Sequence, residues 1–406
     1  MDPTYRWVMG EGSKTRQKVV DALLAGDADW PKILVGFSGV SEISNGLDLR
    51  GIDLRGLDLR RVNFDRVHLE RANLDGVRLS GVSMKYACIR EAILTNADLS
   101  EADLTGSDLQ STDLTGTRFS DATAKGARFS QCLLENADFL RANVSGADFR
   151  NARLVGSVFE YANANFATFS YVHADMLRAA HGTFKKTNWF KARLTSADFS
   201  EASLTEADFS FATLSHATLS RAEMSRAKFK EANLSHAQFQ GVRATGAAFT
   251  AATLSGANFT DGQLSEAVFN NAYAHSPATF DGIRAKQAFF MNVSLQNCSL
   301  RNAAIEQAFL CEADFSNANL SGVLLSGTNL HKASLASAML EDADMTGAML
   351  IGARLCSASL ARATLLKTQL TPDMLFGADL DGALLPANVG EFLPLCSARG
   401  TPVLGE

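Results

Sequence analysis

Apolar residues recur at every fifth position along most of the chain. From Leu49 to Ala274, 46 consecutive positions of this series are apolar, and a second series of 22 runs from Phe280 to Leu385. A small residue, most often alanine, stands two positions before most of them. A helix repeats every 3.6 residues and a strand every two. A period of five therefore predicts a chain that turns a corner every five residues.

A period of 20 residues lies on top of the period of five. Aromatic residues fill a series that steps by 20 from Phe129 to Phe269, with Trp189 among them, and a second aromatic series begins at Phe119. This sorting predicts a four-sided coil of 20 residues, in which the central Leu or Phe and the small residue point inward. Successive coils would lie about 4.8 Å apart, as neighbouring strands do, and this spacing suits stacked rings.

The repeated unit A-(D/N)-(L/F)-x-x over residues 47–385 resembles the pentapeptide-repeat proteins. The resemblance implies an all-β solenoid, a right-handed quadrilateral parallel β-helix of about 17 coils and roughly 80 Å in length. Members of this family include proteins that bind DNA gyrase or topoisomerase IV by imitating B-form DNA. These members protect the enzyme from quinolones and natural poisons, so the resemblance implies antibiotic resistance as one function class.

The segments that flank the repeats differ from them in composition. Residues 13–26 predict a short helix with Ser13 as its N-cap and Gly26 at its end. This helix belongs to an expected N-terminal helical cap segment, residues 1–46, since an open solenoid end exposes core and unpaired backbone. Residues 386–406 are expected either to cap the last coil or to form a homodimer contact.

Two stretches interrupt the regularity of the repeats. The one-residue slip near residues 275–280 predicts a bulge or small loop, since it contains a proline that cannot donate a ladder hydrogen bond. Residues 181–194, HGTFKKTNWFKARL, keep the period of five, so we expect Trp189 in the core. The cations of this irregular region, 171–193, are expected to point outward as a basic patch, either as solvated surface or as a binding site: Lys185, Lys186, Lys191 and Arg193.

The composition indicates the cellular compartment and the kinds of catalytic or metal site that can be expected. Six scattered cysteines without a CxxC pair favour free thiols in a reducing compartment. No apolar leader or 18-residue apolar run occurs, so we expect a bacterial-type cytoplasmic protein with no membrane contact. His216 and His236 are 20 residues apart and should lie one above the other, but two imidazoles alone make a poor metal site. No catalytic motif is present, and we expect a non-enzyme without cofactor or metal.

The charges separate two hypotheses for the function. The net charge is -6, far below the charge of a DNA duplex of this length, although residues 91–170 carry 11 acidic and 6 basic side chains. One column alternates in sign and predicts a ladder of ion pairs along one side. Its members are Asp58, Arg78, Asp98, Arg118 and Asp138.

The first hypothesis is a DNA mimic that binds a type II topoisomerase through Asp103, Asp108 and Asp113. The second is a passive scaffold or effector module that binds another protein through the basic patch or the termini. Direct nucleic-acid binding is not expected, because the net charge is negative and the arginines of the first coils fall on successive sides.

Overall fold

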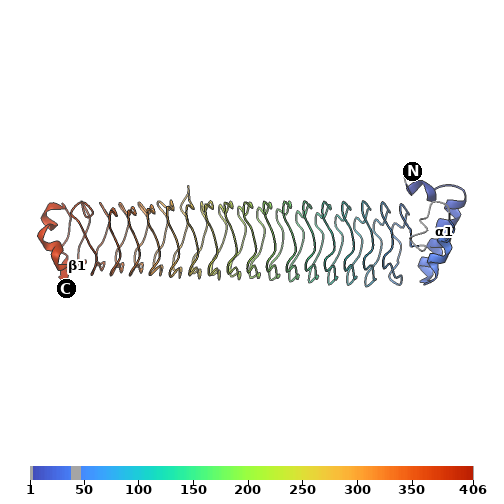
Figure 1. Ribbon diagram of the computed structural model, residues 1–406, viewed down its shortest axis with the longest axis horizontal. Coiled ribbons are helices and arrows are strands. Elements are labelled where there is room, and N and C mark those ends of the chain that lie inside the picture. Colours follow the sequence, from blue (N-terminus) through green and yellow to red (C-terminus); the bar gives the residue numbers. More distant parts are fainter. Residues whose placement is uncertain (1–2, 38–46, 406) are drawn as a thin grey trace. The chain divides into compact units, whose positions relative to one another are not determined.

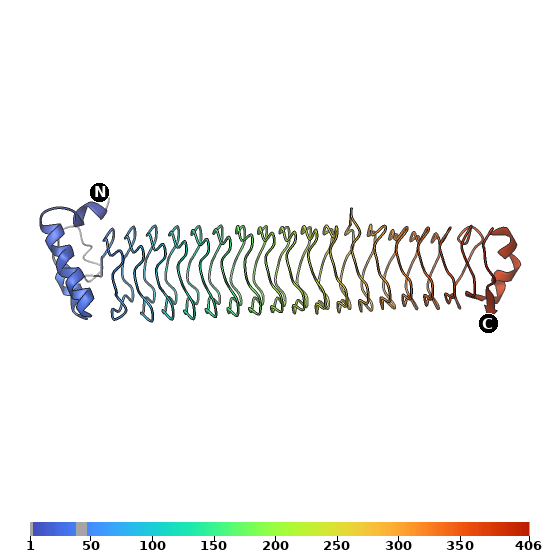
Figure 2. The ribbon, with the colours of Figure 1, turned by 180° about the vertical axis from the view of Figure 1, so that it is seen from behind.

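The computed structural model describes residues 3–37 and 47–405. Parts of the expected N-terminal segment, residues 1–2 and 38–46, lie outside this description, as does residue 406. The chain divides into two compact units, Met1–Ser203 and Leu204–Glu406, and each is described by itself. In each unit the chain winds into stacked coils (Figure 1, Figure 2).

Each coil pairs with the next in parallel through single-residue β-bridges. Asp98 pairs with Arg118, 20 residues on. Leu99 N–H donates to the carbonyl oxygen of Arg118 at 2.8 Å, and Arg118 N–H donates to that of Ala97 at 2.9 Å. Four such bridge positions recur in every 20 residues. The expected β-helix solenoid is confirmed, and its strands are short because the chain turns every five residues.

The corners of the coils lie two residues after each central apolar residue. Their backbone is left-handed, as at Glu101 with φ 59° and Gly106 with φ 66°. None of the described non-glycine residues with positive φ is valine, isoleucine or threonine, which fits the steric penalty of β-branched side chains in this region. Corner side chains point away from the core, so they decide what the solenoid presents to a partner.

The core of each unit consists of stacked rings. In the first unit Phe149 stacks on Phe129 at 4.7 Å and on Phe169 at 4.8 Å, with interplanar angles of 4°. Trp189 continues this stack at 4.0 Å from Phe169. In the second unit Phe249 stacks on Phe229 and Phe269 in the same way. The central positions of both apolar series are buried, except Ala274 beside the slip.

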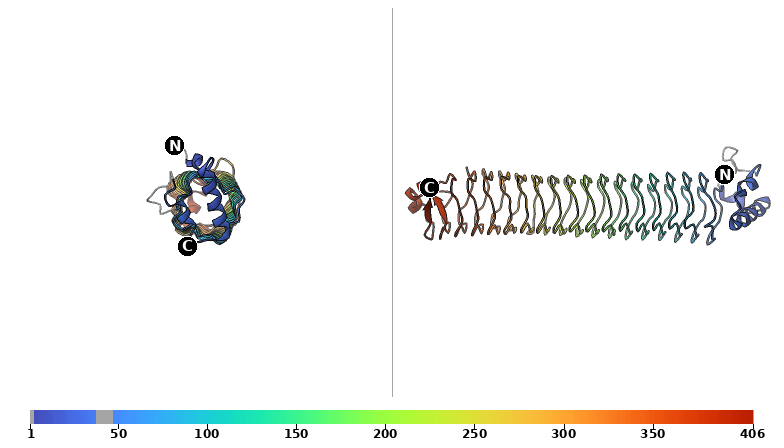
Figure 3. Two further views of the ribbon diagram at one scale, coloured as in Figure 1. Left: turned by 90° about the vertical axis from the view of Figure 1, so that its right-hand side faces the viewer. Right: turned by 90° about the horizontal axis from the view of Figure 1, so that it is seen from below.

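The N-terminal segment covers the first coils. Its described residues form three helices: η1 (Pro3–Trp7), α1 (Glu11–Ala25) and η2 (Trp30–Leu34). Figure 3 shows α1 across the end of the coils. The predicted end at Gly26 is confirmed by its left-handed φ of 68°, but the predicted N-cap, Ser13, is wrong. The N-cap is Gly10, because the helix starts two residues earlier than Ser13 and places that serine in its first turn.

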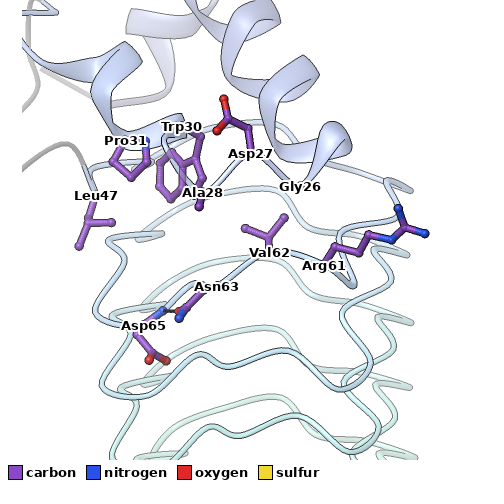
Figure 4. A pocket seen from close by; sticks show the side chains of 10 residues that line it. All are labelled: Gly26, Asp27, Ala28, Trp30, Pro31, Leu47, Arg61, Val62, Asn63 and Asp65. Atoms are coloured by element: carbon purple, nitrogen blue, oxygen red, sulfur yellow. Dashed lines mark hydrogen bonds between the residues drawn. The ribbon is translucent and has the colours of Figure 1, made fainter.

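Specific contacts join this segment to the solenoid. Arg6 forms an ion pair with the buried Asp48 at 2.6 Å, and Trp7 Nε1–H donates to the carbonyl oxygen of Arg50 at 2.8 Å. Trp30 packs against Phe64 with 6.3 Å between ring centroids. Figure 4 shows Trp30 between η2 and the first coils, on the wall of a pocket that Gly26 and Val62 also line. These contacts shield the first rings from water.

The second unit contains the slip and the C-terminal segment. Bridged residues are 20 apart before and after the slip, whereas the pairs that span it, such as Asn258 and Thr279, are 21 apart. The slip is therefore confirmed as a one-residue insertion. A second interruption, which the period of five does not reveal, surrounds Pro372, where Gln369 and Met374 form no bridge.

The chain ends with two short strands and two 3-10 helices. These are β1 (Leu384–Pro386), η4 (Ala387–Glu391), η5 (Leu393–Leu395) and β2 (Val403–Gly405). β2 pairs in parallel with β1, so Leu404 lies beside Leu385. The C-terminal segment thus extends the parallel ladder past the last repeat. Within the described residues, no helix is both long and apolar enough to span a bilayer.

Candidate interaction surfaces

The three acidic candidates lie on different sides of one coil. Asp103, Asp108 and Asp113 are successive bridge residues, five apart, and each pairs with a different residue of the next coil. Since the chain turns a corner between them, the structure does not bring their carboxylates onto one face.

Most of this acidic charge has a cation beside it. Lys85 Nζ lies 3.1 Å from Asp103, and Arg128 lies 3.7 Å from Asp108. Burial opposes ionisation of Asp103, but hydrogen bonds from Thr105 and Lys85 together hold its pKa below the ordinary value. Within the part of the chain that the structure describes, Asp113 has no cation at ion-pair distance, and it accepts a hydrogen bond from Thr115 N–H at 3.1 Å.

The predicted ion-pair ladder is present in part. Its five members are bridged in sequence. Arg118 lies 2.8 Å from Asp98, and Arg78 lies 3.8 Å from Asp58. Asp138 instead accepts a hydrogen bond from the hydroxyl of Ser120. These pairs reduce the negative potential that a DNA mimic needs.

The four cations of the basic patch have different surroundings. Arg193 forms an ion pair with Asp175 at 3.0 Å. Lys191 Nζ lies 5.9 Å from the ring centroid of Tyr171 and 5.4 Å from that of Phe190. Lys185 is exposed and donates its backbone N–H to Asn165 Oδ1. Lys186 occupies a left-handed corner with φ 56°. Trp189 is fully buried, as predicted.

One coil carries large apolar side chains at all four of its corners. Their exposed fractions are 57% for Tyr161, 64% for Phe166, 52% for Tyr171 and 57% for Met176. All four have left-handed backbone, with φ between 57° and 63°. We call these four residues the corner band. The corners of the preceding coil are Arg141, Gly146, Asn151 and Gly156. The corner band therefore has no large apolar corner side chain next to it on the N-terminal side.

Basic and imidazole groups border the corner band on its C-terminal edge. His181 stacks on Tyr161 with 4.8 Å between ring centroids and an interplanar angle of 9°, and Lys191 lies over Tyr171. The inward positions alone do not reveal the corner band. The signal is nevertheless readable, since the second residue after four successive central residues is Tyr, Phe, Tyr and Met.

The two histidines that were expected to lie one above the other do so in the second unit. His216 and His236 stack with 4.9 Å between ring centroids. Both occupy left-handed corners, so their rings lie outside the packed core.

Comparison with family models identifies the repeats. A model described as pentapeptide repeats (8 copies) matches residues 45–81, 87–121, 118–156, 137–172, 313–348 and 338–371, and one described as a pentapeptide repeat region matches residues 192–269. The chain belongs to the pentapeptide-repeat family. A search of curated proteins found no match to this pentapeptide-repeat protein.

Solved structures similar to this pentapeptide-repeat protein include three of different origin. HetL, from the cyanobacterium Nostoc sp. strain PCC 7120 and involved in heterocyst differentiation regulation, is 27% identical, with 50% of this chain and 88% of HetL covered and a TM-score of 0.30. QnrB1, a plasmid-mediated fluoroquinolone resistance protein, is 19% identical, with 55% and 91% covered and a TM-score of 0.24. A pentapeptide repeat protein from the Arabidopsis thaliana thylakoid lumen is 30% identical, with 31% and 63% covered and a TM-score of 0.11.

Proposed function

We propose that this pentapeptide-repeat protein is a non-enzymatic scaffold that binds another protein through two adjacent corners of the corner band, Phe166 and Tyr171. The four corners of the coil are five residues apart and face different ways, so one partner contacts neighbouring corners and not all four. The observation that carries the proposal is the exposure of Tyr161, Phe166, Tyr171 and Met176 on one coil. Aromatic residues and methionine are enriched in protein interfaces, and buried aromatic anchors supply most of the binding energy there. Elsewhere these corners are largely glycine, asparagine or charged residues.

The corner backbone does not require the large side chains of the corner band. A non-glycine residue in the left-handed region costs roughly 1–2 kcal/mol. Glycine fills the same kind of corner at Gly146 and Gly156 with φ near 70°. The large side chains are therefore not needed to form the corner.

The partner is expected to have an apolar surface with acidic groups beside it. His181 and Lys191 border the band, and a partner carboxylate there would be attracted to Lys191. Charge complementarity of this kind adds specificity and association rate more than affinity.

The proposal is tested by quantitative affinity capture from the source cells. Immobilised wild-type protein is compared with the double variant Phe166→Gly/Tyr171→Gly and with Tyr86→Gly. Tyr86 is a matched control, because it is a left-handed corner residue that is 61% exposed on a coil whose other corners are Gly81, Glu91 and Asn96. We expect one partner to be retained by wild type and Tyr86→Gly and lost from the double variant. Equal capture by all three would contradict the proposal.

Binding to a type II topoisomerase is the second candidate function. It rests on the excess of acidic residues in 91–170 and on Asp113, which has no cation at ion-pair distance among the described residues. The test is a DNA gyrase supercoiling assay with and without a fluoroquinolone. Inhibition or drug protection that is lost in Asp103→Lys/Asp108→Lys/Asp113→Lys would support it, and no effect of the wild-type protein at tens of micromolar would exclude it.

The remaining expectations form part of the proposal. They are a right-handed, four-sided coil of about 17 turns, a cytoplasmic location, and a C-terminal segment, residues 386–406, that either caps the last coil or forms a homodimer contact. Leu395 is 73% exposed and Val403 is 56% exposed, which supports a contact at the C-terminal segment. Light scattering of the purified protein tests the dimer, and a monomer at micromolar concentration would contradict it.

A further inference from the structure

Three metal-ligating side chains meet on one side of the first coils. They are His68, Glu70 and Cys88, whose ligand atoms all lie within 4.8 Å of one another. His68 Nδ1 lies 3.3 Å from Glu70 Oε1. The solenoid brings them together in a simple way: His68 and Cys88 are bridged residues of adjacent coils, and Glu70 follows His68 by two residues.

The carboxylate of Glu70 is incompletely satisfied. Its Oε2 atom is buried and has no hydrogen-bond partner among the described residues. Burying a polar atom without a partner is unfavourable, and such atoms are rare in folded proteins. A cation bound between the three side chains would supply the missing interaction.

A second histidine–carboxylate pair has a cation at the third position. His173 Nε2 lies 2.8 Å from Asp175, again two residues on. There the bridged residue of the next coil is Arg193, which forms an ion pair with Asp175 at 3.0 Å. At His68 the corresponding residue is Cys88, so a thiol stands where Arg193 supplies a cation in the second pair.

The nearest coil on the N-terminal side supplies no spare cation from Arg50, because its guanidinium is engaged by Asp48 at 2.6 Å. A divalent metal ion stabilises the thiolate form of a cysteine ligand, and the thiol proton is released on binding.

We propose that His68, Glu70 and Cys88 bind a divalent transition metal ion of the zinc class. One nitrogen, one oxygen and one sulfur ligand suit Zn²⁺ or Co²⁺, whereas Mg²⁺ and Ca²⁺ prefer oxygen ligands only. Three protein ligands leave the fourth tetrahedral position open. This site is independent of the corner band, which lies on a later coil.

The test is a Co²⁺ titration of the full-length, tag-free protein followed by absorption spectroscopy. A thiolate–cobalt bond produces a charge-transfer band in the near ultraviolet, and tetrahedral cobalt produces ligand-field bands in the visible. We expect both bands at one equivalent, competition by Zn²⁺ and no competition by Mg²⁺. Absence of the charge-transfer band in the wild-type protein would overturn the proposal.

Variants identify the ligands. Cys88→Ser should abolish the charge-transfer band. His68→Ala removes a ligand and should weaken cobalt binding by more than the roughly tenfold that loss of an outer-shell partner costs. Glu70→Gln keeps the side-chain size and should weaken binding without unfolding, which circular dichroism checks. Cys311→Ser is the matched control, because Cys311 is also a half-buried free thiol. A band that survives in Cys88→Ser or disappears in Cys311→Ser would assign the metal elsewhere and contradict the proposal.

Discussion

Thr187 and Trp189 form a hydrogen-bonded pair inside the core of the first unit. The hydroxyl of Thr187 accepts a hydrogen bond from the indole Nε1–H of Trp189 at 2.9 Å and donates one to the carbonyl oxygen of Phe184 at 2.7 Å. Both side chains are buried. The small-residue position holds threonine here because the tryptophan beside it adds a polar atom that needs an acceptor.

Thr187→Ala should lower the free energy of unfolding by about 1–3 kcal/mol, because it removes the acceptor of a buried donor. The double variant Thr187→Ala/Trp189→Phe recreates the pair found at Ala147 and Phe149 and should recover part of this loss. Denaturant unfolding of the wild type, both single variants and the double variant forms a double-mutant cycle. Single effects that simply add would show that the two side chains are not coupled.

Phe166→Gly should weaken partner binding without lowering the free energy of unfolding. The side chain is exposed at φ 63°, so glycine should leave the free energy of unfolding unchanged or raise it by about 1 kcal/mol. Phe149→Ala, in the ring stack, should instead lower it by about 3–5 kcal/mol. Thermal and denaturant unfolding measure both. A loss of stability in Phe166→Gly similar to that in Phe149→Ala would mean that the corner band is structural.

Acid should destabilise the first coils in a defined pH range. A hydrogen bond from the guanidinium of Arg60 is the main cause that lowers the pKa of Asp58 from 3.8 to about 2. Because the folded-state pKa lies below the unfolded one, the stabilisation is present above pH 4 and is lost as the pH falls towards 2. An NMR titration of Asp58 checks the value, and Arg60→Ala should return the pKa towards 3.8. An unchanged pKa in that variant would contradict the assigned cause.

The sequence predicts the register of the fold in detail because every inward position obeys one rule. Phe129 and Phe149 are found stacked as expected, and so is Trp189. The sequence pattern does not predict the features that local backbone geometry determines. Ser13 is a common capping residue, but the helix begins at Glu11. The interruption at Pro372 leaves the apolar period intact, so periodicity cannot reveal it.

The candidate surfaces were harder to predict than the core. Asp103, Asp108 and Asp113 are acidic and close in sequence, but five-residue spacing places them on different sides. The exposure of the corner-band side chains can be inferred only when their positions at the corners of the coil are known. The cluster at Cys88 becomes visible only when residues 18 and 20 apart are compared together with their outward direction, and no short-range ligand motif marks it.

Site-specific photo-crosslinking in the source cells detects protein binding at single residues of the corner band. A photoreactive phenylalanine analogue is placed at Phe166, at Tyr171 and, as the control, at Tyr86. We expect irradiation to attach the same partner protein at Phe166 and Tyr171 and none at Tyr86. Crosslinks to that partner from Tyr86 with equal yield, or no crosslinked protein at Phe166 and Tyr171, would contradict the proposed binding.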